Sequence, residues 1–253
     1  MMLSKEKFSA LCRSASDVAT LRDSAGIGTY NEKPLHKILK RTVCEDENAF
    51  EVKIGSFVAD VRHEGRIVEI QTGGFYPLVQ KLRYFLENTD DEIVVLHPID
   101  AELTLIRVDP DTGEVIRKKR SPKKERPCDV LCELFYLREL FASPRVSVLI
   151  ASVRGEEYRF SERVRGRKTG AYDAVYLPKE LLETTWLSTP QDIVAVLPQE
   201  LRDLSEFDAE TFGKMMKLRA GRKRSAAISC LLSFGILVRR KEGKKYIYSW
   251  KKT

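Results

Sequence analysis

The spacing of apolar side chains along the chain predicts alternating strands and helices. Residues 50–54 alternate apolar and polar side chains, which is typical of a strand, whereas residues 35–43 carry apolar side chains at helical spacing. Pro110 and Gly113 predict a turn between two apolar runs. In chain order we expect a helix at 34–43, strands at 50–54, 57–61 and 67–71, a helix at 78–86, a strand from 92 that Pro98 ends, a hairpin at 104–119, a helix at 128–141 and a strand at 145–153. This order is typical of an α/β (α+β) protein in which helices flank a mixed sheet.

The pattern changes at residue 189 to short helices followed by a basic hairpin. Thr189 and Pro190 are favoured at the N-cap and the first position of a helix, and Gly235 is typical of the position just after a helix. Between these residues we expect helices at 209–217 and 222–234, and after Gly235 we expect a hairpin at 236–250. The inward-facing residues of these helices should be Phe212, Met215, Met216, Ala226, Ala227, Cys230, Leu231 and Phe234. We therefore divide the chain into an N-terminal extension (1–30), an α/β domain (31–154), a polar connector (155–188) and a C-terminal domain (189–253).

Composition excludes several classes of protein. The chain has 253 residues, 43% of them hydrophobic and 32% charged, which is typical of a folded globular protein. No apolar stretch is long enough to cross a membrane, and the N-terminus lacks the apolar run of a signal peptide, so we expect a cytoplasmic protein without a membrane partner. Five scattered cysteines do not resemble a secreted disulfide scaffold. Cys128 and Cys132 share a helix face without a second metal-ligating pair, so we expect buried thiols there rather than a zinc site.

Positive charge is concentrated near the C-terminus. The whole chain has a net charge of +7, but residues 214–253 hold thirteen Lys and Arg and one acid, a balance of +12, whereas the rest of the chain carries −5. A basic segment on a folded unit is the usual signature of nucleic-acid binding, and a solvated basic surface is the alternative. Residues 117–126 are a second basic run, either a solvated loop or an arm that contacts phosphates, and residues 159–173 are a further candidate. The candidate contacts in the second run are Lys118, Lys119, Lys123 and Lys124.

The order helix, turn, basic helix, glycine and two-stranded hairpin in residues 209–250 resembles a winged helix-turn-helix. The resemblance makes 222–234 the recognition helix, whose N-terminal end meets base edges or phosphates in such proteins. It places three further lysines on the wing, where phosphate contact is typical. The candidate contacts are Arg222, Lys223 and Arg224 on the helix and Lys241, Lys244 and Lys245 on the wing. DNA is the partner that this resemblance implies, and a winged helix used for protein contacts is the alternative.

Two carboxylates interrupt the apolar runs FVADV and VEIQT. A two-residue turn at Glu64–Gly65 would place Asp60 directly opposite Glu69 in a hairpin. Like charges so placed destabilise a hairpin, so the pair needs a proton, a basic side chain or a divalent metal. The alternative is a solvated edge with Arg62 or Arg66 nearby.

The order helix, strand, Asp-bearing strand, Glu-x-Gln strand, helix and strand resembles the core of the PD-(D/E)XK nuclease superfamily over residues 31–100. The matching residues are Asp60 and Glu69-Ile70-Gln71, and V-A-D-V followed by V-E-I-Q-T looks like the competence-associated CoiA-like members, where glutamine replaces the motif lysine. Gln80 and Tyr84 on the next helix are similar to the Q-x-x-x-Y of RecB-type nucleases.

The resemblance implies hydrolysis of phosphodiesters with Mg²⁺ or Mn²⁺. Asp60, Glu69 and the carbonyl of Ile70 would hold the metal, which lowers the pKa of a bound water. Gln71 can orient a water but supplies no charge, and Lys81 on the next helix is the residue that we expect to replace the family's lysine. Glu32 is either a further acid of the site or a first-turn residue favoured by the helix dipole.

The sequence thus supports a Mg²⁺-dependent deoxyribonuclease with a DNA-binding C-terminal domain. The alternatives are a non-catalytic DNA-binding or regulatory protein that retains the nuclease fold, and a winged-helix adaptor for another protein. His36, His63 and His97 lack metal-site spacing, and we expect them at surface or packing positions. The choice between DNA and RNA and the oligomeric state, a homodimer included, stay open.

Overall fold

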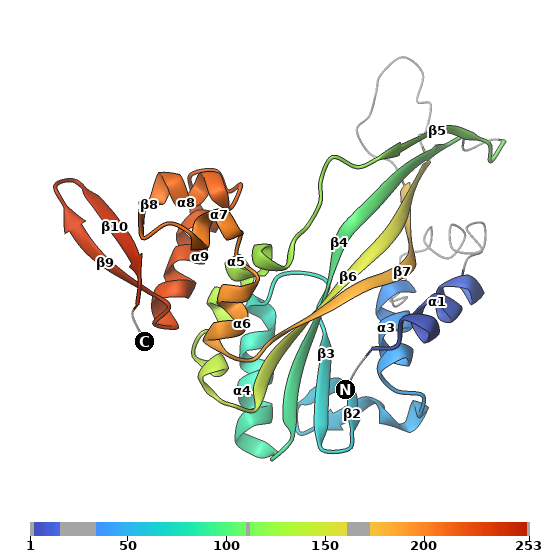
Figure 1. Ribbon diagram of the computed structural model, residues 1–253. Coiled ribbons are helices and arrows are strands. Elements are labelled where there is room, and N and C mark those ends of the chain that lie inside the picture. The colour runs from blue at the N-terminus through green and yellow to red at the C-terminus, as the bar shows by residue number, and fades with distance from the viewer. Residues whose placement is uncertain (1–2, 16–33, 110–111, 161–172, 252–253) are drawn as a thin grey trace.

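The computed structural model describes residues 3–15, 34–109, 112–160 and 173–251. Its centre is a seven-stranded mixed sheet with the strand order β1-β2-β3-β4-β6-β7, in which β5 also pairs with β4 (Figure 1). Strands β3, β4 and β6 run parallel to one another, and the other pairs are antiparallel. The strands are β1 (Phe50–Ile54), β2 (Phe57–His63), β3 (Arg66–Ile70), β4 (Glu92–Val108), β5 (Val115–Arg120), β6 (Val146–Phe160) and β7 (Asp173–Leu187). The expected mixed sheet flanked by helices is confirmed.

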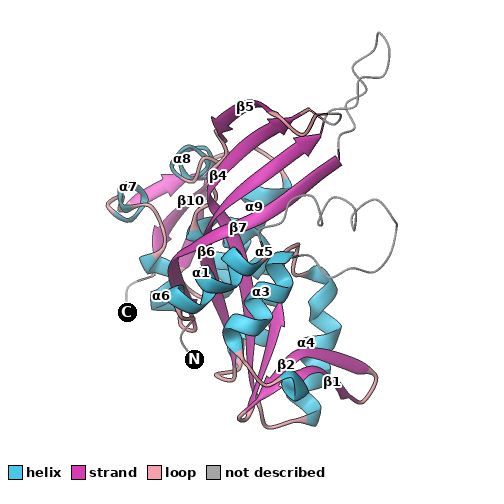
Figure 2. Ribbon diagram, turned by 90° about the vertical axis from the view of Figure 1, so that its right-hand side faces the viewer, coloured by secondary structure: helices cyan, strands magenta, loops and turns pink. Residues whose placement is uncertain are grey.

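Helices cover both faces of this sheet (Figure 2). Helices α4 (Val79–Asn88) and α5 (Leu131–Leu134) lie on one face, and α1 (Lys5–Ser14) and α3 (Pro34–Val43) on the other. Alternation along each strand sends neighbouring apolar side chains to opposite cores. The first core contains Ile67, Ile93, Val95, Leu82, Phe85 and Leu131, and the second contains Val61, Val68, Val94, Leu96, Phe8 and Leu39. Each such burial contributes about 1.5–3 kcal/mol, so the two cores fix how the helices lie on the sheet.

The β2–β3 hairpin has the expected register. His63 pairs with Arg66 and Val61 with Val68. Glu64 and Gly65 both have positive φ, +48° and +70°, which is the conformation that a two-residue type I′ turn requires. The turn and the buried face together therefore set the register of this hairpin.

Strand β4 does not end at Pro98, as the sequence suggested, but continues to Val108. Pro98 pairs in register with Ala151 of β6. On the other side of β4, β3 ends opposite Leu96 and β5 begins only at Thr104, so the missing N–H of Pro98 falls where no strand of the described chain needs it.

The expected helix at 128–141 is a series of short helical turns. Val130, Cys132 and Phe141 are buried in this segment, and five further buried residues recur at every third position, which is the period of a 3₁₀-helix. These positions are Cys128, Leu131, Leu134, Leu137 and Leu140. The two thiols expected to be buried here are buried.

The segment 155–188 is not a loop connector, because it contains the end of β6 and all of β7. Its polar composition reflects strands that extend beyond the helices. Charged residues pair across these strands instead: Arg154 pairs with Glu180, and Glu156 lies 3.0 Å from Lys118 and 3.2 Å from Lys179. Most of the further basic candidate, residues 159–173, lies outside the described residues.

Residues 189–251, here called the C-terminal unit, follow as short helices and a small sheet of order β8-β10-β9. Its elements are α6 (Pro190–Ala195), α7 (Gln199–Arg202), β8 (Glu206–Asp208), α8 (Ala209–Met215), α9 (Arg222–Ser233), β9 (Leu237–Glu242) and β10 (Lys245–Trp250). Gly235 has φ +65° and ends α9 as expected, with the Ile236 N–H bonded to the carbonyl of Leu231. Strand β8 was not expected, because three residues are too few to show a period.

The C-terminal unit packs against the α/β domain. Helix α9 lies on α5, and the Cys132 thiol donates to the carbonyl of Lys223 at 3.4 Å. Ala227, Cys230 and Leu231 share one core with α4 and α5. In the part of the chain that the structure describes, no helix is both long and apolar enough to cross a membrane.

Candidate active site

Asp60 lies at an irregularity of β2, where the regular alternation of side chains between the two faces of the sheet is broken. Ala59 and Val61 are two residues apart, which in a regular strand puts them on one face, yet they pack into opposite cores. On β1, Glu51 sits between the residues that pair with Ala59 and Val61, and its φ is +51°. A positive φ costs a non-glycine residue about 1–3 kcal/mol and is often found at functional sites.

Beyond the last backbone pair of β2 and β3, the carboxylates of Asp60 and Glu69 each accept a hydrogen bond from a backbone N–H of the neighbouring strand. The β2–β3 pairing ends at Val61 and Val68, so Asp60 and Glu69 are not the directly opposed pair that the sequence suggested. Instead the Ile70 N–H donates to Asp60 Oδ2 at 2.7 Å, and the Asp60 N–H donates to Glu69 Oε1 at 3.2 Å. Both carboxyl groups therefore lie between β2 and β3, each hydrogen-bonded to the backbone of the other strand.

Glu69 is the most deeply buried acid of this group, with 2% of its surface exposed. Its Oε2 accepts from Lys81 Nζ at 2.5 Å, and Lys81 comes from α4. Burial, and then the negative charge of Asp60, raise the pKa of Glu69 to about 7, although Lys81 acts in the opposite direction.

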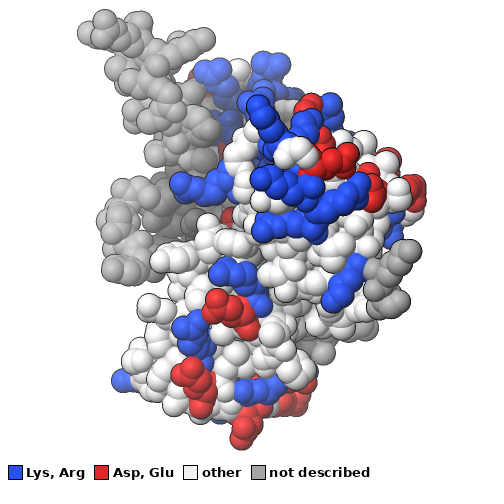
Figure 3. Space-filling model, turned by 90° about the vertical axis from the view of Figure 1, so that its left-hand side faces the viewer, with Lys and Arg blue, Asp and Glu red and all other residues white. Residues whose placement is uncertain are grey.

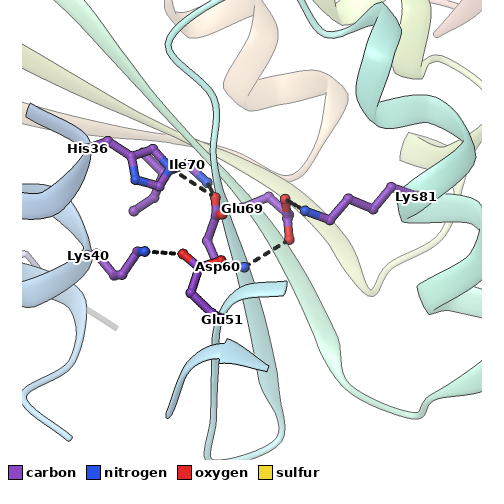
Figure 4. Close-up of polar contacts among 7 residues, drawn as sticks. All are labelled: His36, Lys40, Glu51, Asp60, Glu69, Ile70 and Lys81. Carbon is purple, nitrogen blue, oxygen red and sulfur yellow. Dashed lines mark hydrogen bonds and ion pairs between the residues drawn. The ribbon is translucent and has the colours of Figure 1, made fainter. Parts of the chain in front are cut away.

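His36 approaches Asp60 from α3, on the other side of the sheet (Figure 4). Its Nε2 lies 3.2 Å from Asp60 Oδ2. Burial alone would raise the pKa of Asp60, but the hydrogen bonds from His36 and the Ile70 N–H lower it overall. Environments that separate the pKa values of two neighbouring carboxyl groups are typical of acid–base sites. One turn further on, Lys40 pairs with Glu51.

His36, which we expect from the sequence at a surface or packing position, lies instead on a carboxylate of the candidate site. The signal was weak but present. His36 and Lys40 are four residues apart on a helix, so they share a face. Only the packing of α3 over β2 shows that this face meets Asp60 and Glu51.

The oxygen donors suit Mg²⁺ or Mn²⁺ in kind but are already engaged. Carboxylates are the ligands that these cations prefer. Both oxygens of Glu69 accept hydrogen bonds, and Oδ2 of Asp60 accepts two. Within the described residues, no group of three His, Cys, Asp or Glu side chains comes together as a metal site. A cation would therefore be held by Asp60 and Glu69 in competition with Lys81. The hydrogen bond from Ile70 to Asp60 uses the Ile70 N–H and does not involve its carbonyl, which is the third expected ligand.

No side-chain hydrogen bond of the described residues joins Gln71, Gln80 or Tyr84 to Asp60 or Glu69. The Gln71 side chain donates to the Gly74 carbonyl at 2.5 Å, and Gln80 is exposed on α4. Tyr84 packs against Phe57, with ring centres 5.3 Å apart. Glu32 lies outside the described residues.

The basic candidates form two separate surfaces. Figure 3 shows Lys and Arg gathered over the C-terminal unit. The second surface, formed by the basic run 117–126 on and after β5, lies on the opposite side of the molecule in Figure 1. Arg222, Lys223, Lys241 and Lys244 are exposed, Arg224 is half-buried, and Lys245 lies 3.3 Å from Asp208. On the second surface, Lys119 and Lys124 are exposed, Lys118 pairs with Glu156, and Lys123 pairs with Glu125.

Comparison with known proteins places most of the α/β part in one family. Residues 33–187 match the family model described as "Domain of unknown function (DUF8091)", which spans Asp60, Glu69 and Lys81 and stops before the C-terminal unit. The chain is similar to an uncharacterized protein of Treponema pallidum (strain Nichols), with 29% identity over 142 residues. The aligned part is 56% of this chain and 55% of the relative, so the chain spans about half the length of that protein. No solved structure matches the chain.

Proposed function

The chain belongs to the DUF8091 family, and we propose that it hydrolyses phosphodiester bonds in nucleic acid at a site built from Asp60, Glu69 and Lys81. One observation carries the proposal: a carboxyl group that is 2% exposed, with a pKa of about 7, touches both a second acid and a lysine. Buried groups with displaced pKa values and specific charged partners are enriched at functional sites. The positive φ of Glu51 opposite Asp60 supports the same interpretation.

The order of elements around the site also supports it. Helix α3, strands β1 to β3, helix α4 and strand β4 follow one another, with β3 parallel to β4. The same order of elements underlies the resemblance to the PD-(D/E)XK nucleases. The order α8, α9, Gly235, β9 and β10 agrees in the same way with the expected winged helix-turn-helix. Both resemblances remain part of the proposal.

The residues of the site divide the work between them. A bound Mg²⁺ or Mn²⁺ would lower the pKa of a water and neutralise charge on the phosphate. Asp60, whose pKa is lowered, stays ionised at neutral pH and would hold the cation, while His36 orients its carboxylate. Lys81 supplies beside Glu69 the positive charge that Gln71 lacks. With a pKa near 7, Glu69 can accept or release a proton in the physiological range.

A second candidate function is binding without cleavage. The Lys81 ammonium already compensates Glu69, and the Gln71 side chain donates to the Gly74 carbonyl. These contacts satisfy the charges of the site within the protein itself. In that case the positive surface of the C-terminal unit would carry the function, and the α/β domain would only support it.

The test is cleavage of plasmid, branched DNA and single-stranded RNA with Mg²⁺ or Mn²⁺. We expect Asp60→Asn and Glu69→Gln each to lower the cleavage rate by about 100-fold or more, as loss of a group that stabilises charge in the transition state does. Asp91→Asn is the matched control, because Asp91 directly precedes β4, is 8% exposed and pairs with Arg62 at 2.9 Å. Equal cleavage by wild type and both site variants would assign the activity to a contaminant. No cleavage by wild type, with retained nucleic-acid binding, would favour the second candidate.

A further inference from the structure

A pocket lies under the β9–β10 hairpin, between that hairpin and the first turns of α8 and α9. Its volume is about 240 Å³, smaller than the roughly 300–1,000 Å³ typical of pockets for drug-sized ligands. The pocket therefore suits a small group better than a large ligand. Its lining includes Asp208, Glu210, Arg224, Lys245, Tyr246 and Tyr248.

One wall of the pocket is aromatic. Tyr246 and Tyr248 are two residues apart on β10 and so share a face of the hairpin. Tyr248 is buried against Phe207, whereas Tyr246 continues this face beyond the core and is 45% exposed. The Arg239 guanidinium lies 4.8 Å from the centre of the Tyr246 ring and stabilises its position. An exposed ring held in this way is a platform on which another ring can stack.

The charges around the pocket are positive and largely unpaired. Residues 206–250 hold eleven Lys and Arg and four acids, a balance of +7. All four acids are paired in the structure: Glu206 and Glu242 with Arg240, Asp208 with Lys245, and Glu210 with Lys214. No ion pair among the described residues engages the remaining cations nearest the pocket, which are Arg222, Lys223, Arg224, Arg239, Lys241 and Lys244. An aromatic platform surrounded by uncompensated cations is the arrangement that proteins use for unpaired nucleotides.

We infer that this pocket binds one unpaired base of a nucleic-acid strand, which stacks on Tyr246 while its neighbouring phosphates contact Arg224, Lys241 and Lys244. The inference rests on the proposed function only in taking nucleic acid as the ligand. It adds that the substrate carries a single-stranded end or a bulge next to a duplex. Stacking is insensitive to sequence, because every base has an aromatic face. The pocket thus selects a structure of nucleic acid, not a sequence.

The experiment is fluorescence anisotropy of the full chain in EDTA, where cleavage requiring a divalent cation cannot contribute. The probes are a blunt duplex, the same duplex with a three-nucleotide overhang, and a third in which the overhang is abasic. We expect wild type to bind the overhang duplex about tenfold or more tightly than the other two, which is the usual scale of base–aromatic stacking. Tyr246→Ala should abolish this difference and leave blunt-duplex affinity within about twofold, whereas Tyr246→Phe should keep it.

The matched control is Tyr76→Ala, because Tyr76 is 71% exposed and lies on the α/β domain instead of the C-terminal unit. It should leave all three affinities unchanged. Equal binding of the three probes by wild type would overturn the inference, and so would a loss in Tyr246→Ala that is the same for all three. A preference for the overhang in a protein that cuts nothing would refute the nuclease proposal and leave this inference standing.

Discussion

Replacing Glu69 by Gln removes an ionisable group from the candidate site and keeps its size. In the folded chain the pKa of Glu69 is about 7, raised from its ordinary value of 4.5. A carboxyl group with a raised pKa binds its proton more tightly in the folded state, so it stabilises folding at low pH relative to high pH. This stability is present below pH 4.5 and is lost as the pH rises through 7. Because a tenfold change in proton affinity is worth 1.36 kcal/mol, the loss between pH 5 and pH 8 is about 2–3 kcal/mol.

The assay is urea unfolding of wild type and Glu69→Gln at pH 5, 6, 7 and 8. Contributions from groups that do not interact with Glu69 cancel in the difference between the two proteins. That difference should change by about 2–3 kcal/mol in favour of the variant from pH 5 to pH 8. Asp60 does not obscure this window, since its pKa is lowered and its contribution is lost only at acid pH, as the pH falls through that lowered value. Glu87→Gln, an exposed position on α4, is the matched control and should show no such trend.

A difference that stays constant within about 0.5 kcal/mol across this range would refute the reasoning, because a trend of 2–3 kcal/mol lies well outside the error expected for distant, independent changes. It would mean that Lys81 fully compensates the burial of Glu69. The candidate site would then be a structural ion pair, and the proposal of an acid–base role for Glu69 would lose its basis.

Three further predictions concern other parts of the chain. His36→Ala should raise the pKa of Asp60 and move the acid limb of any cleavage profile to higher pH, whereas His36→Gln should restore it in part; the measurement is the rate against pH. Gly55→Ala should cost more than Gly113→Ala by about 1–3 kcal/mol in urea unfolding, because both glycines have positive φ but only at Gly55 would the new Cβ overlap the Tyr84 ring. All five cysteines are buried thiols, so a thiol reagent should modify them slowly in the native protein and completely in denaturant. Rapid native labelling would contradict this burial.

The sequence by itself determined those features that depend on neighbours along the chain. The Glu64–Gly65 turn set the register of the β2–β3 hairpin, and Gly235 set the end of α9, since each needs a particular backbone conformation at one residue. The order of helices and strands from α3 to β4 also followed from periodicity, because one buried face imposes one period.

The tertiary structure decided what local patterns do not specify. Pro98 stays within β4 because no described strand pairs with β4 on the side to which the Pro98 nitrogen points. Residues 127–142 form short helical turns that pack into the same core as α4 and α9. The polar residues of β7 form a strand because their charges pair across the sheet. In each case the outcome depends on a partner far away in the sequence.

The same holds for the candidate site. The sequence singled out Asp60, Glu69 and Lys81, but it did not show that Glu51 turns β1 at positive φ or that His36 lies on Asp60. Nor did it show that Glu69 is buried enough to raise its pKa to about 7. Proton affinity depends on burial and on charges a few ångströms away, and these are fixed only when α3 and α4 pack on opposite faces of the sheet.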